Sequence, residues 1–481
     1  MNTKLLKQKI LDLAIRGKLT QQLKSDGTAA DLLTQISDER RETRDERKGT
    51  RSKKSGVILS EAQSAKSKDL GRIIPLDKNE APFEIPENWE WVRLGDVCEL
   101  ISGQDFPPEK YNAEKKGLPY ITGASNFVNN HVILNRWTEY PSVIAQKGDI
   151  LLVCKGSGYG NYVYADFEKA HIARQIMAIR ISDKTLNAYV YNFLGSQYER
   201  LKFQGNGLVP GIARSVVLDL TVPLPPLAEQ QRIVAKIEEA FAEIDAVEKN
   251  KELLKTHIKQ TRQKILDLAI HGKLVPQDKN DEPASVLLER ITRDNPHYEK
   301  IEDEPFEIPQ NWVWCKLGNL FFHTTGKALK KANSTGIQRN YITTSNLYWC
   351  EFDLSEVRSM YFTEDELDKC TAKKGDLLLC NGGDVGRAAI WNFDYDICFQ
   401  NHISRLRPKS VSLSNVFYLY VIRYNKEKGN LNGRGVGITS LSANDLLSLV
   451  VPLPPLAEQS RIVAKIEELF STLDQMERNL I

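Results

Sequence analysis

One segment of the sequence occurs twice, and it decides the expected fold. Val222–Phe241 reads VPLPPLAEQQRIVAKIEEAF and Val451–Phe470 reads VPLPPLAEQSRIVAKIEELF, so the two copies differ at two of twenty positions. The prolines hold an extended backbone that cannot belong to a helix, whereas the glutamate that follows them suits the positive N-terminal end of one. Each copy therefore predicts a proline turn followed by a helix.

Two shorter repeats accompany this segment. Lys9–Leu19 (KILDLAIRGKL) returns as Lys264–Leu274, and Phe83–Trp91 (FEIPENWEW) returns as Phe306–Trp314 (FEIPQNWVW). Such a repeat predicts a duplicated frame around two inserts whose interiors differ. The expected regions are an N-terminal helical region at 1–36, a charged linker at 37–82, a first insert at 83–221, a central coiled-coil region at 222–291, a linker at 292–305, a second insert at 306–450 and a C-terminal helix at 451–481 that packs with the N-terminal helix.

The first copy has about 32 more residues than the second between Ile36 and Phe83. This stretch contains DERRETRDERKGTRSKKSG, which is polar, highly charged and poor in apolar residues. Such a composition predicts a mobile surface loop. Two roles stay open for the basic residues near 40–54, since they could form a solvated charged surface or contact DNA phosphates.

Apolar residues step by three and four along 233–268, which is the heptad pattern of a coiled coil. Gly272 is a plausible end for a helix of about 45 residues. The termini carry the same pattern, so we expect an antiparallel coiled coil with pseudo-twofold symmetry; an ordinary oligomerisation coil is the alternative. The predicted seam consists of Leu6, Ile10, Leu13, Ile233, Ile237, Ile244, Val247, Leu254, Ile258, Ile265, Leu268, Ile462, Ile466, Leu469, Leu473 and Met476.

The two inserts have short motifs in common. Lys147–Leu152 (KGDILL) answers Lys374–Leu379 (KGDLLL), which predicts a turn and a buried strand in each insert. A glycine-rich loop follows both motifs. The expected fold class is therefore α/β (α+β) for each insert, in two copies separated by the long coiled coil.

Composition limits the function. The 481 residues have 41% hydrophobic content and a net charge of +2, so any basic surface is local. Seven cysteines without a CxxC pair indicate reduced thiols and no zinc site. No signal peptide or long apolar segment is evident, which favours a cytoplasmic protein. We find no catalytic triad, no phosphate-binding loop and no [N/D/S]-P-P-[Y/F] motif, so we expect no catalytic residues and no enzyme activity of the chain itself.

Together, the PLPPLAEQ helix, the KILDLAIxGKL helix and the FEIPxNWxW segment resemble the specificity subunit of Type I restriction–modification enzymes. The resemblance covers nearly the whole chain. It implies that each insert is a target recognition domain that binds one half of an asymmetric bipartite site in double-stranded DNA. It also implies that the helices set the spacer and dock two methyltransferase subunits, and that restriction subunits join that core. S-adenosylmethionine, ATP and Mg would then belong to these partners, and none to this chain.

DNA binding needs cations for phosphates and planar polar side chains for base edges. In the first insert the candidates are Lys155 and Tyr159 in the glycine loop, Arg174 and Gln175 beside a strand, and Arg214 in a late loop. In the second insert they are Lys327, Lys330, Lys331 and Arg339 early in the insert, Arg387 in the glycine loop, then Gln400, His402 and Arg434. The alternative is a coiled-coil adapter whose inserts bind protein. The bases that are read and the base that is methylated stay open.

Overall fold

The structure is a computed structural model that describes residues 2–55, 73–77, 81–156, 158–204, 211–293, 298–328, 335–431, 433 and 440–480, with the backbone alone beyond Glu42 in the helix there. The chain divides into two units, Met1–Lys249 and Asn250–Ile481, and each is considered by itself. The helix α8 (Leu227–Ile270) runs through the division. Within the described residues, no helix has the length and apolar character that a membrane crossing requires.

The first unit combines helices with short strands. Its helices are α1 (Thr3–Ile15), α2 (Ala29–Ser55), α4 (Leu94–Val97), α5 (Lys184–Ser196), α6 (Tyr198–Gln204) and α7 (Arg214–Leu218). Its strands are β1 (Glu90–Arg93), β2 (Glu99–Ser102), β3 (Leu118–Ile121), β4 (Phe127–Val128), β5 (His131–Val132), β6 (Trp137–Thr138), β7 (Ile144–Gln146), β8 (Ile150–Val153), β9 (Tyr162–Tyr164), β10 (Lys169–Ile172), β11 (Ile176–Arg180) and β12 (Thr221–Leu224).

Two four-stranded sheets form the body of this unit, with the strand orders β2-β11-β8-β9 and β6-β3-β10-β7. All four side chains of β8 are buried, as expected for a central strand of the core. Strand β1 pairs antiparallel with β12, so Trp91 lies opposite Pro223 and the two edges of the insert are joined.

The second unit repeats this plan. Its helices are α9 (Ala284–Thr292), α10 (Leu317–Leu320), α11 (Glu364–Cys370), α12 (Asn415–Glu427), α13 (Ala443–Leu447) and α14 (Leu456–Arg478). Its strands are β13 (Val313–Lys316), β14 (Phe321–Thr325), β15 (Ile337–Ile342), β16 (Arg358–Phe362), β17 (Thr371–Ala372), β18 (Leu377–Cys380), β19 (Ala388–Ile390), β20 (Ile397–Phe399), β21 (Ile403–Pro408) and β22 (Val450–Leu453).

The sheets of the second unit have the orders β14-β21-β18-β19 and β16-β15-β20-β17. Strands β13 and β22 pair antiparallel, and Trp314 lies opposite Pro452 as Trp91 does opposite Pro223. The mixed α/β character predicted for the inserts is therefore confirmed in both units. The predicted domain bounds stay a prediction.

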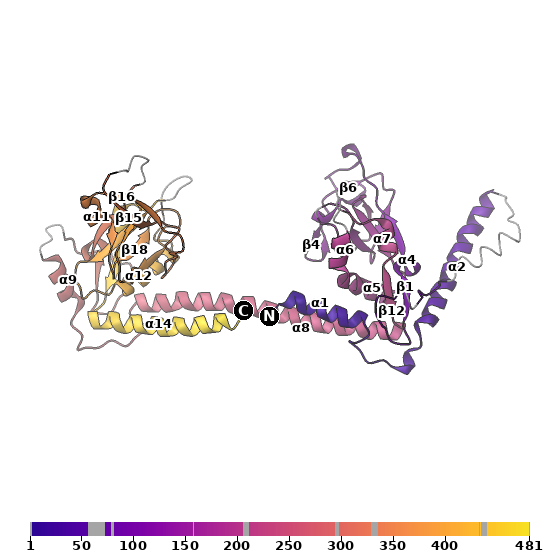
Figure 1. Ribbon diagram of the computed structural model, residues 1–481, viewed down its shortest axis with the longest axis horizontal. Coiled ribbons are helices and arrows are strands. Elements are labelled where there is room, and N and C mark those ends of the chain that lie inside the picture. Colours follow the sequence, from indigo (N-terminus) through magenta and orange to yellow (C-terminus); the bar gives the residue numbers. More distant parts are fainter. Residues whose placement is uncertain are drawn as a thin grey trace. The chain divides into compact units, whose positions relative to one another are not determined.

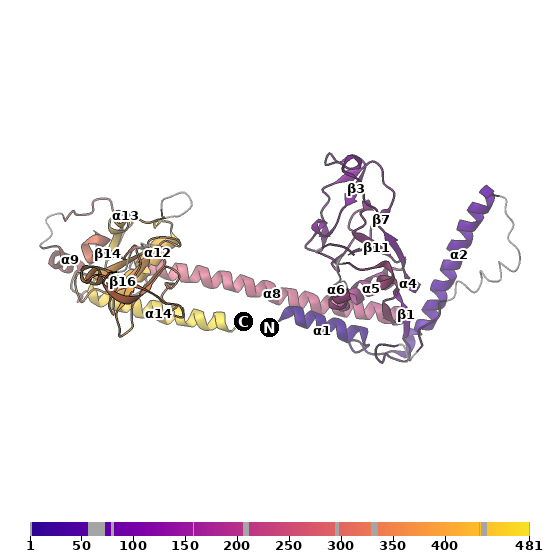
Figure 2. The ribbon, with the colours of Figure 1, turned by 45° about the horizontal axis from the view of Figure 1, so that its top comes forward.

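A helix pair supports each insert. In the first unit α1 runs antiparallel to α8, since Lys7 binds Asp245 while Thr20, beyond the end of α1, bonds to Glu229 at 3.2 Å (Figure 1). In the second unit α14 runs antiparallel to α8, and the guanidinium of Arg262 binds the carboxylate of Glu477 at 3.0 Å. Figure 2 shows both pairs from another side. The predicted packing of the C-terminal helix on the N-terminal helix stays a prediction.

The predicted helix length is confirmed, since α8 has 44 residues and Gly272 follows its end with a φ of +67°. The seam needs correction at four predicted positions, which are exposed: Leu6, Val247, Leu254 and Met476. Eight others are buried: Ile233, Ile237, Ile244, Ile258, Ile265, Ile462, Ile466 and Leu473. The remaining four, Ile10, Leu13, Leu268 and Leu469, are half-buried.

The sequence pattern missed a second apolar face on these helices. Leu11, Ala14 and Ile15 of α1 are buried in the core of the first insert, and Leu266, Ala269 and Ile270 of α8 are buried in that of the second. These helices therefore serve two neighbours, the partner helix and the insert. A heptad pattern alone describes one such interface.

The prediction of a loop over the charged linker was wrong for its first part. Helix α2 continues to Ser55, so the backbone of residues 40–54 is helical. Glutamate, arginine and lysine favour helices, and an ion pair of 3.5 Å between Arg41 and Asp38, one turn apart, stabilises the helix further. Residues 56–72 of the linker lie outside the described residues.

The three repeated motifs meet at one junction in each unit. In the first unit, the indole Nε1 of Trp89 donates to Oε2 of Glu229 at 2.8 Å, and Arg232 binds the buried carboxylate of Asp26 at 2.6 Å. The Arg232 guanidinium lowers the pKa of Asp26. A methyl group at Gly17 would lie 2.4 Å from Cγ of Pro86, so only glycine fits there.

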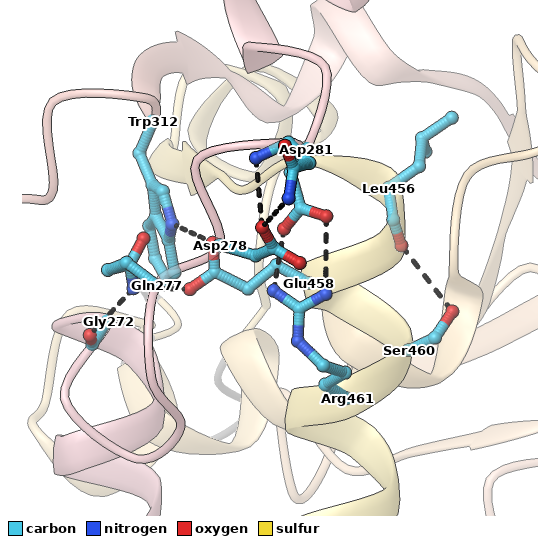
Figure 3. Close-up of polar contacts among 10 residues, drawn as sticks. Gly272, Gln277, Asp278, Asp281, Trp312, Leu456, Glu458, Ser460 and Arg461 are labelled. Carbon is cyan, nitrogen blue, oxygen red and sulfur yellow. Dashed lines mark hydrogen bonds and ion pairs between the residues drawn. The ribbon is translucent and has the colours of Figure 1, made fainter.

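The second junction has the same construction (Figure 3). Trp312 donates to Oε2 of Glu458 at 2.9 Å, and Gln277 donates to the other oxygen at 2.5 Å. Arg461 binds Asp281 at 2.6 Å. Burial raises the pKa of Glu458, although the donors from Trp312 and Gln277 oppose the shift. The glutamate of PLPPLAEQ thus does more than complement a helix end, because it joins the helix to the FEIPxNW segment.

Buried ion pairs explain the repeated KGD turn. Asp149 is almost fully buried and accepts two hydrogen bonds from Arg180 at the end of β11, at 2.9 and 2.8 Å. Asp376 and Arg407 form the same pair at 2.7 and 2.6 Å. The predicted turn and buried strand are confirmed, and Arg180 and Arg407 are shown to be structural.

Candidate nucleic-acid interface

In each unit, a glycine loop, a strand start and a late loop converge. In the first unit, the N–H of Cys154 donates to the carbonyl of Gln175 at 2.7 Å, and the carbonyl of Cys154 accepts from Ile212 at 2.7 Å. In the second unit, Asn381 makes the same two bonds, with His402 at 3.0 Å and Leu441 at 2.8 Å. Gln175 and His402 therefore occupy equivalent positions.

Glycines make room for both side chains. A methyl group at Gly123 would lie 2.5 Å from Oε1 of Gln175, and one at Gly382 would lie 2.7 Å from Nδ1 of His402. Gln175 and His402 are exposed, so their polar ends are accessible to a ligand. A carboxamide and an imidazole have different patterns of donors and acceptors. The two units therefore offer unlike polar groups on similar backbones.

Exposed cations lie on the loops and the strand start that meet at this position in the first unit. Lys155 is exposed beside Gly211, and Arg214 is exposed with its Nη1 3.1 Å from Oγ of Ser102. Arg174 is 68% exposed although its Nε lies 2.6 Å from the carboxylate of Asp105. Lys155, Arg174, Gln175 and Arg214, four of the five residues predicted for this insert, thus lie on segments that meet in the folded chain.

Tyr159, the fifth predicted residue, has a structural role. Its hydroxyl donates to the carbonyl of Lys202 at 3.0 Å, and its half-buried ring packs against the core. Sequence reasoning could not separate it from an exposed tyrosine, because the glycine loop around it indicated a surface position.

The residues predicted for the second insert fall into three groups. Arg339 and His402 are exposed, and Gln400 is half-buried. Lys327 and Arg387 make internal contacts. Lys330, Lys331 and Arg434 lie outside the described residues.

Lys327 is tied down by its own chain. Its side chain is 9% exposed, and its ammonium lies 2.6 Å from Glu366 and donates to the carbonyl of Tyr361 at 2.8 Å. This contact lowers the pKa of Glu366. A buried ammonium that is paired with a carboxylate has little attraction for a phosphate, so Lys327 stabilises the fold.

Arg387 is likewise engaged within the second unit. It donates to the carbonyl of Thr344 and lies over the ring of Tyr348, 4.9 Å from the centroid. Arg339 differs, because it lies on the exposed part of β15 at the edge of a polar cavity of about 670 Å³ that Asp368 and Asp396 also line.

Sequence comparison identifies the family of this chain. Residues 86–256 and 309–481 both match the family described as the Type I restriction modification DNA specificity domain. The chain belongs to this family and contains its domain twice.

Specificity subunits are among the similar proteins. The specificity subunit of the Type I restriction enzyme EcoAI from Escherichia coli is 24% identical, and the match covers 98% of this chain and 90% of that protein. The putative MjaX specificity subunit from Methanocaldococcus jannaschii is 30% identical over 195 residues, which are 40% of this chain and 44% of that protein.

Solved structures share the fold. A chain from a study of complex assembly and conformational transition in the type I R-M system has a TM-score of 0.56 at 20% identity, with 83% of this chain and 94% of that chain covered. The HsdS subunit from Thermoanaerobacter tengcongensis has a TM-score of 0.51 at 18% identity, with the same coverage.

Proposed function

We propose that this chain is the non-catalytic DNA-reading subunit of a cytoplasmic Type I restriction–modification complex. Each insert, 83–221 and 306–450, reads one half of an asymmetric bipartite site in double-stranded DNA. The helices between them set the spacer and dock two methyltransferase subunits, which restriction subunits join. S-adenosylmethionine, ATP and Mg act on those partners. The duplication of the junctions supports a tandem repeat with pseudo-twofold symmetry.

One observation carries this proposal. Gln175 and His402 lie at equivalent positions on matching backbones, both exposed and both beside a glycine, but they differ in hydrogen-bonding chemistry. A repeated scaffold with unlike exposed groups is what a protein needs to read two different half-sites. The glutamine carboxamide suits adenine, whereas an imidazole presents a single donor or acceptor on each ring nitrogen.

Charge supports DNA as the ligand of the first unit. Arg174 is adjacent to Gln175 in sequence and Lys155 follows Cys154, which is bonded to Gln175, and both are exposed, so cations for phosphates lie near a planar polar group for a base edge. Arg214 adds an exposed cation on the late loop. Asp105 offsets part of the charge of Arg174. Binding of this kind weakens as salt rises, because phosphate contacts release counterions.

The test is an exchange of recognition domains in the whole complex. Residues 83–221 are replaced by the corresponding domain of another specificity subunit, and methylated sites are mapped in cells that also produce the methyltransferase and restriction subunits. We expect one half-site to change and the other to persist. A palindromic target in the original complex, or a change in both half-sites, would contradict the proposal. Salt-independent retention of the purified chain on DNA would contradict the phosphate contacts.

A further inference from the structure

The first unit has an open groove between its insert and the helix α8. It has a volume of about 770 Å³, and aromatic rings from β9, α5 and α8 line it, namely those of Tyr162, Tyr164, Tyr191 and Phe241. Tyr191 stacks on Tyr164 with the ring centroids 4.1 Å apart and meets Tyr162 edge-on at 4.9 Å. Grooves lined by rigid aromatic side chains bind large apolar groups well.

A turn after a buried asparagine borders this place in each unit, although its backbone differs, since Asn129 and Asn130 both have positive φ in the first unit and Cys350 alone does in the second. The buried Asn126 donates from Nδ2 to the carbonyl of Ile133, seven residues later, and Asn346 does so to Asp353. The residue three positions after this asparagine is Asn129 in the first unit and Trp349 in the second. Asn129 lines the groove and is exposed.

In the second unit the chain supplies its own aromatic group at this place. Trp349 and Phe470, the counterpart of Phe241, are both half-buried and pack against the core cluster of the second unit. The guanidinium of Arg423 lies over both rings, 5.8 Å from the centroid of Trp349 and 5.6 Å from that of Phe470. The guanidinium of Arg423 thus contacts an indole of the turn and the phenylalanine of the helix.

Part of this difference is a change in the neighbouring strand. Tyr162 lies opposite Leu152, whereas Ala388 holds the corresponding place opposite Leu379. In the first unit the large side chain is Tyr162 on the strand, whereas in the second unit it is Trp349 on the turn. Nevertheless, the tyrosines leave a groove in the first unit.

Charge indicates which ligand fits the groove. Glu238 and Asp245 lie on its rim, and Lys7 binds Asp245 and lies over the ring of Phe241, 5.6 Å from the centroid, so the carboxylate of Glu238 is the charge that faces a ligand. Carboxylates repel phosphates and attract cations, so a basic protein segment suits the rim better than a nucleic acid. Arg423 lies over the equivalent phenylalanine of the second unit, Phe470, also 5.6 Å from the ring centroid, so the two units do not differ in having a cation over this ring.

We propose that the groove of the first unit receives an aromatic side chain, with a lysine or arginine beside it, from a methyltransferase subunit. The inference rests on the proposed function, since it specifies where that partner docks. In the second unit Trp349 and Arg423 occupy the corresponding place, so the partner there lacks this contact. The two methyltransferase subunits therefore bind one chain with unequal affinity.

The test fills the groove with the residue that the second unit uses. Asn129→Trp in the full-length chain is expected to weaken the tighter of two binding steps by about 10-fold, because buried aromatic anchors dominate interface energies. Two controls are needed, because the φ of +50° at Asn129 disfavours tryptophan itself. Asn129→Ala carries the same backbone cost without filling the groove, and Val128→Trp adds the same side chain at the adjacent exposed position outside the groove. Glu238→Gln is expected to weaken this step about threefold and to reduce its dependence on salt. Titration with the purified methyltransferase subunit, followed by native mass spectrometry and calorimetry, separates the steps.

Crosslinking identifies the occupant. A photoreactive phenylalanine at Asn130 is expected to capture a methyltransferase peptide that contains an aromatic and a basic residue. Capture of DNA, or of a second copy of this chain, would overturn the proposal, as would two equal binding steps in the unmodified protein. DNA binding of the Asn129→Trp chain is measured in parallel. If the unmodified chain does not bind DNA, the proposed function is refuted. If the variant binds the methyltransferase as tightly as the unmodified chain does, only the proposed docking at the groove is refuted.

Discussion

Trp312 and Glu458 join the FEIPxNW segment to the PLPPLAEQ helix of the second unit through a buried hydrogen bond of 2.9 Å. Trp89 and Glu229 form the same bond at 2.8 Å, so the same pair of residue types closes the junction in each unit. A buried carboxylate that accepts such bonds is costly to remove, because its donors are then left without a partner.

Glu458→Ala is expected to lower the free energy of unfolding by about 1–3 kcal/mol, since Trp312 and Gln277 both lose their acceptor. Glu458→Gln retains one acceptor oxygen and is expected to cost less. Urea unfolding of the full chain, followed by tryptophan fluorescence, measures both. Equal losses in the two variants would show that the carboxylate has no such role.

Gly272→Ala is expected to destabilise the second unit by about 2 kcal/mol or more, as a φ of +67° disfavours alanine and its methyl group would lie 2.4 Å from Cγ of Pro309. Gly375→Ala is the matched control, because its φ is +91° but no atom lies within 4 Å. It isolates the backbone cost. Thermal melting that ranks the control as the worse variant would contradict the close packing at the junction.

Asp149→Ala is expected to cost about 3 kcal/mol, because it leaves the guanidinium of Arg180 without its partner in a mostly buried place. Asp219→Ala breaks the exposed pair with Arg93 in the same unit and is expected to cost less than about 1 kcal/mol. Denaturant titration of both variants provides the comparison. If they lose equal stability, the KGD turn is not a brace of the fold.

His171 makes the first unit sensitive to acid. Burial lowers the pKa of His171, and its Nδ1 accepts from the N–H groups of Ser142 and Val143 at 3.3 and 3.2 Å, which requires the neutral ring. The unfolded chain therefore binds a proton more readily than the folded one. Stability is expected to be full above pH of about 6.5 and to fall as the pH drops below that value.

The control variant is His171→Cys, which places at this position the residue type of Cys398 in the second unit. Each of the two pairs with a tyrosine of the adjacent parallel strand, Tyr120 or Tyr341. The variant is expected to lose part of the acid dependence. The remainder belongs to groups such as His323, whose pKa burial also lowers. Unfolding curves at pH 5.5 and 7.5 that change equally in both proteins would rule out this role of His171.

Gln175→Ala is expected to relax one position of one half-site, with a loss of about 1–3 kcal/mol in discrimination between bases. His402→Ala is expected to do the same in the other half-site, so each variant controls for the other. Sequencing of DNA selected by each complex measures this. A uniform loss over all sequences would instead indicate phosphate contacts by these residues.

Much of the frame could be predicted because it occurs twice. The heptad steps that follow PLPPLAEQ predicted the long helix and its end at Gly272, and the repeated KGD motif predicted the buried strand after each turn. Tertiary partners could not be read from a single chain. The pattern of α1 pointed to Leu6 and Leu13, whereas Leu11, Ala14 and Ile15 are buried, because the insert competes with the partner helix for the apolar residues.

The candidate interface was harder to predict than the frame. Residue type favoured Lys327, early in the second insert, as it favoured Lys155 in the glycine loop of the first. The structure pairs Lys327 with the carboxylate of Glu366, which lies 39 residues later in helix α11. Helix formation over residues 40–54 was missed for a related reason. The highly charged composition predicts a loop, although Glu, Arg and Lys are each good helix formers.

The junctions have an evolutionary consequence. Trp89, Glu229, Arg232 and Asp26 have identical counterparts in the second unit, so the side chains that close each junction are interchangeable between copies. A genetic crossover within these matching stretches would restore an intact junction whichever insert it brought along. New pairings of inserts could thus arise in a single recombination event, with the inherited frame already compatible with each of them.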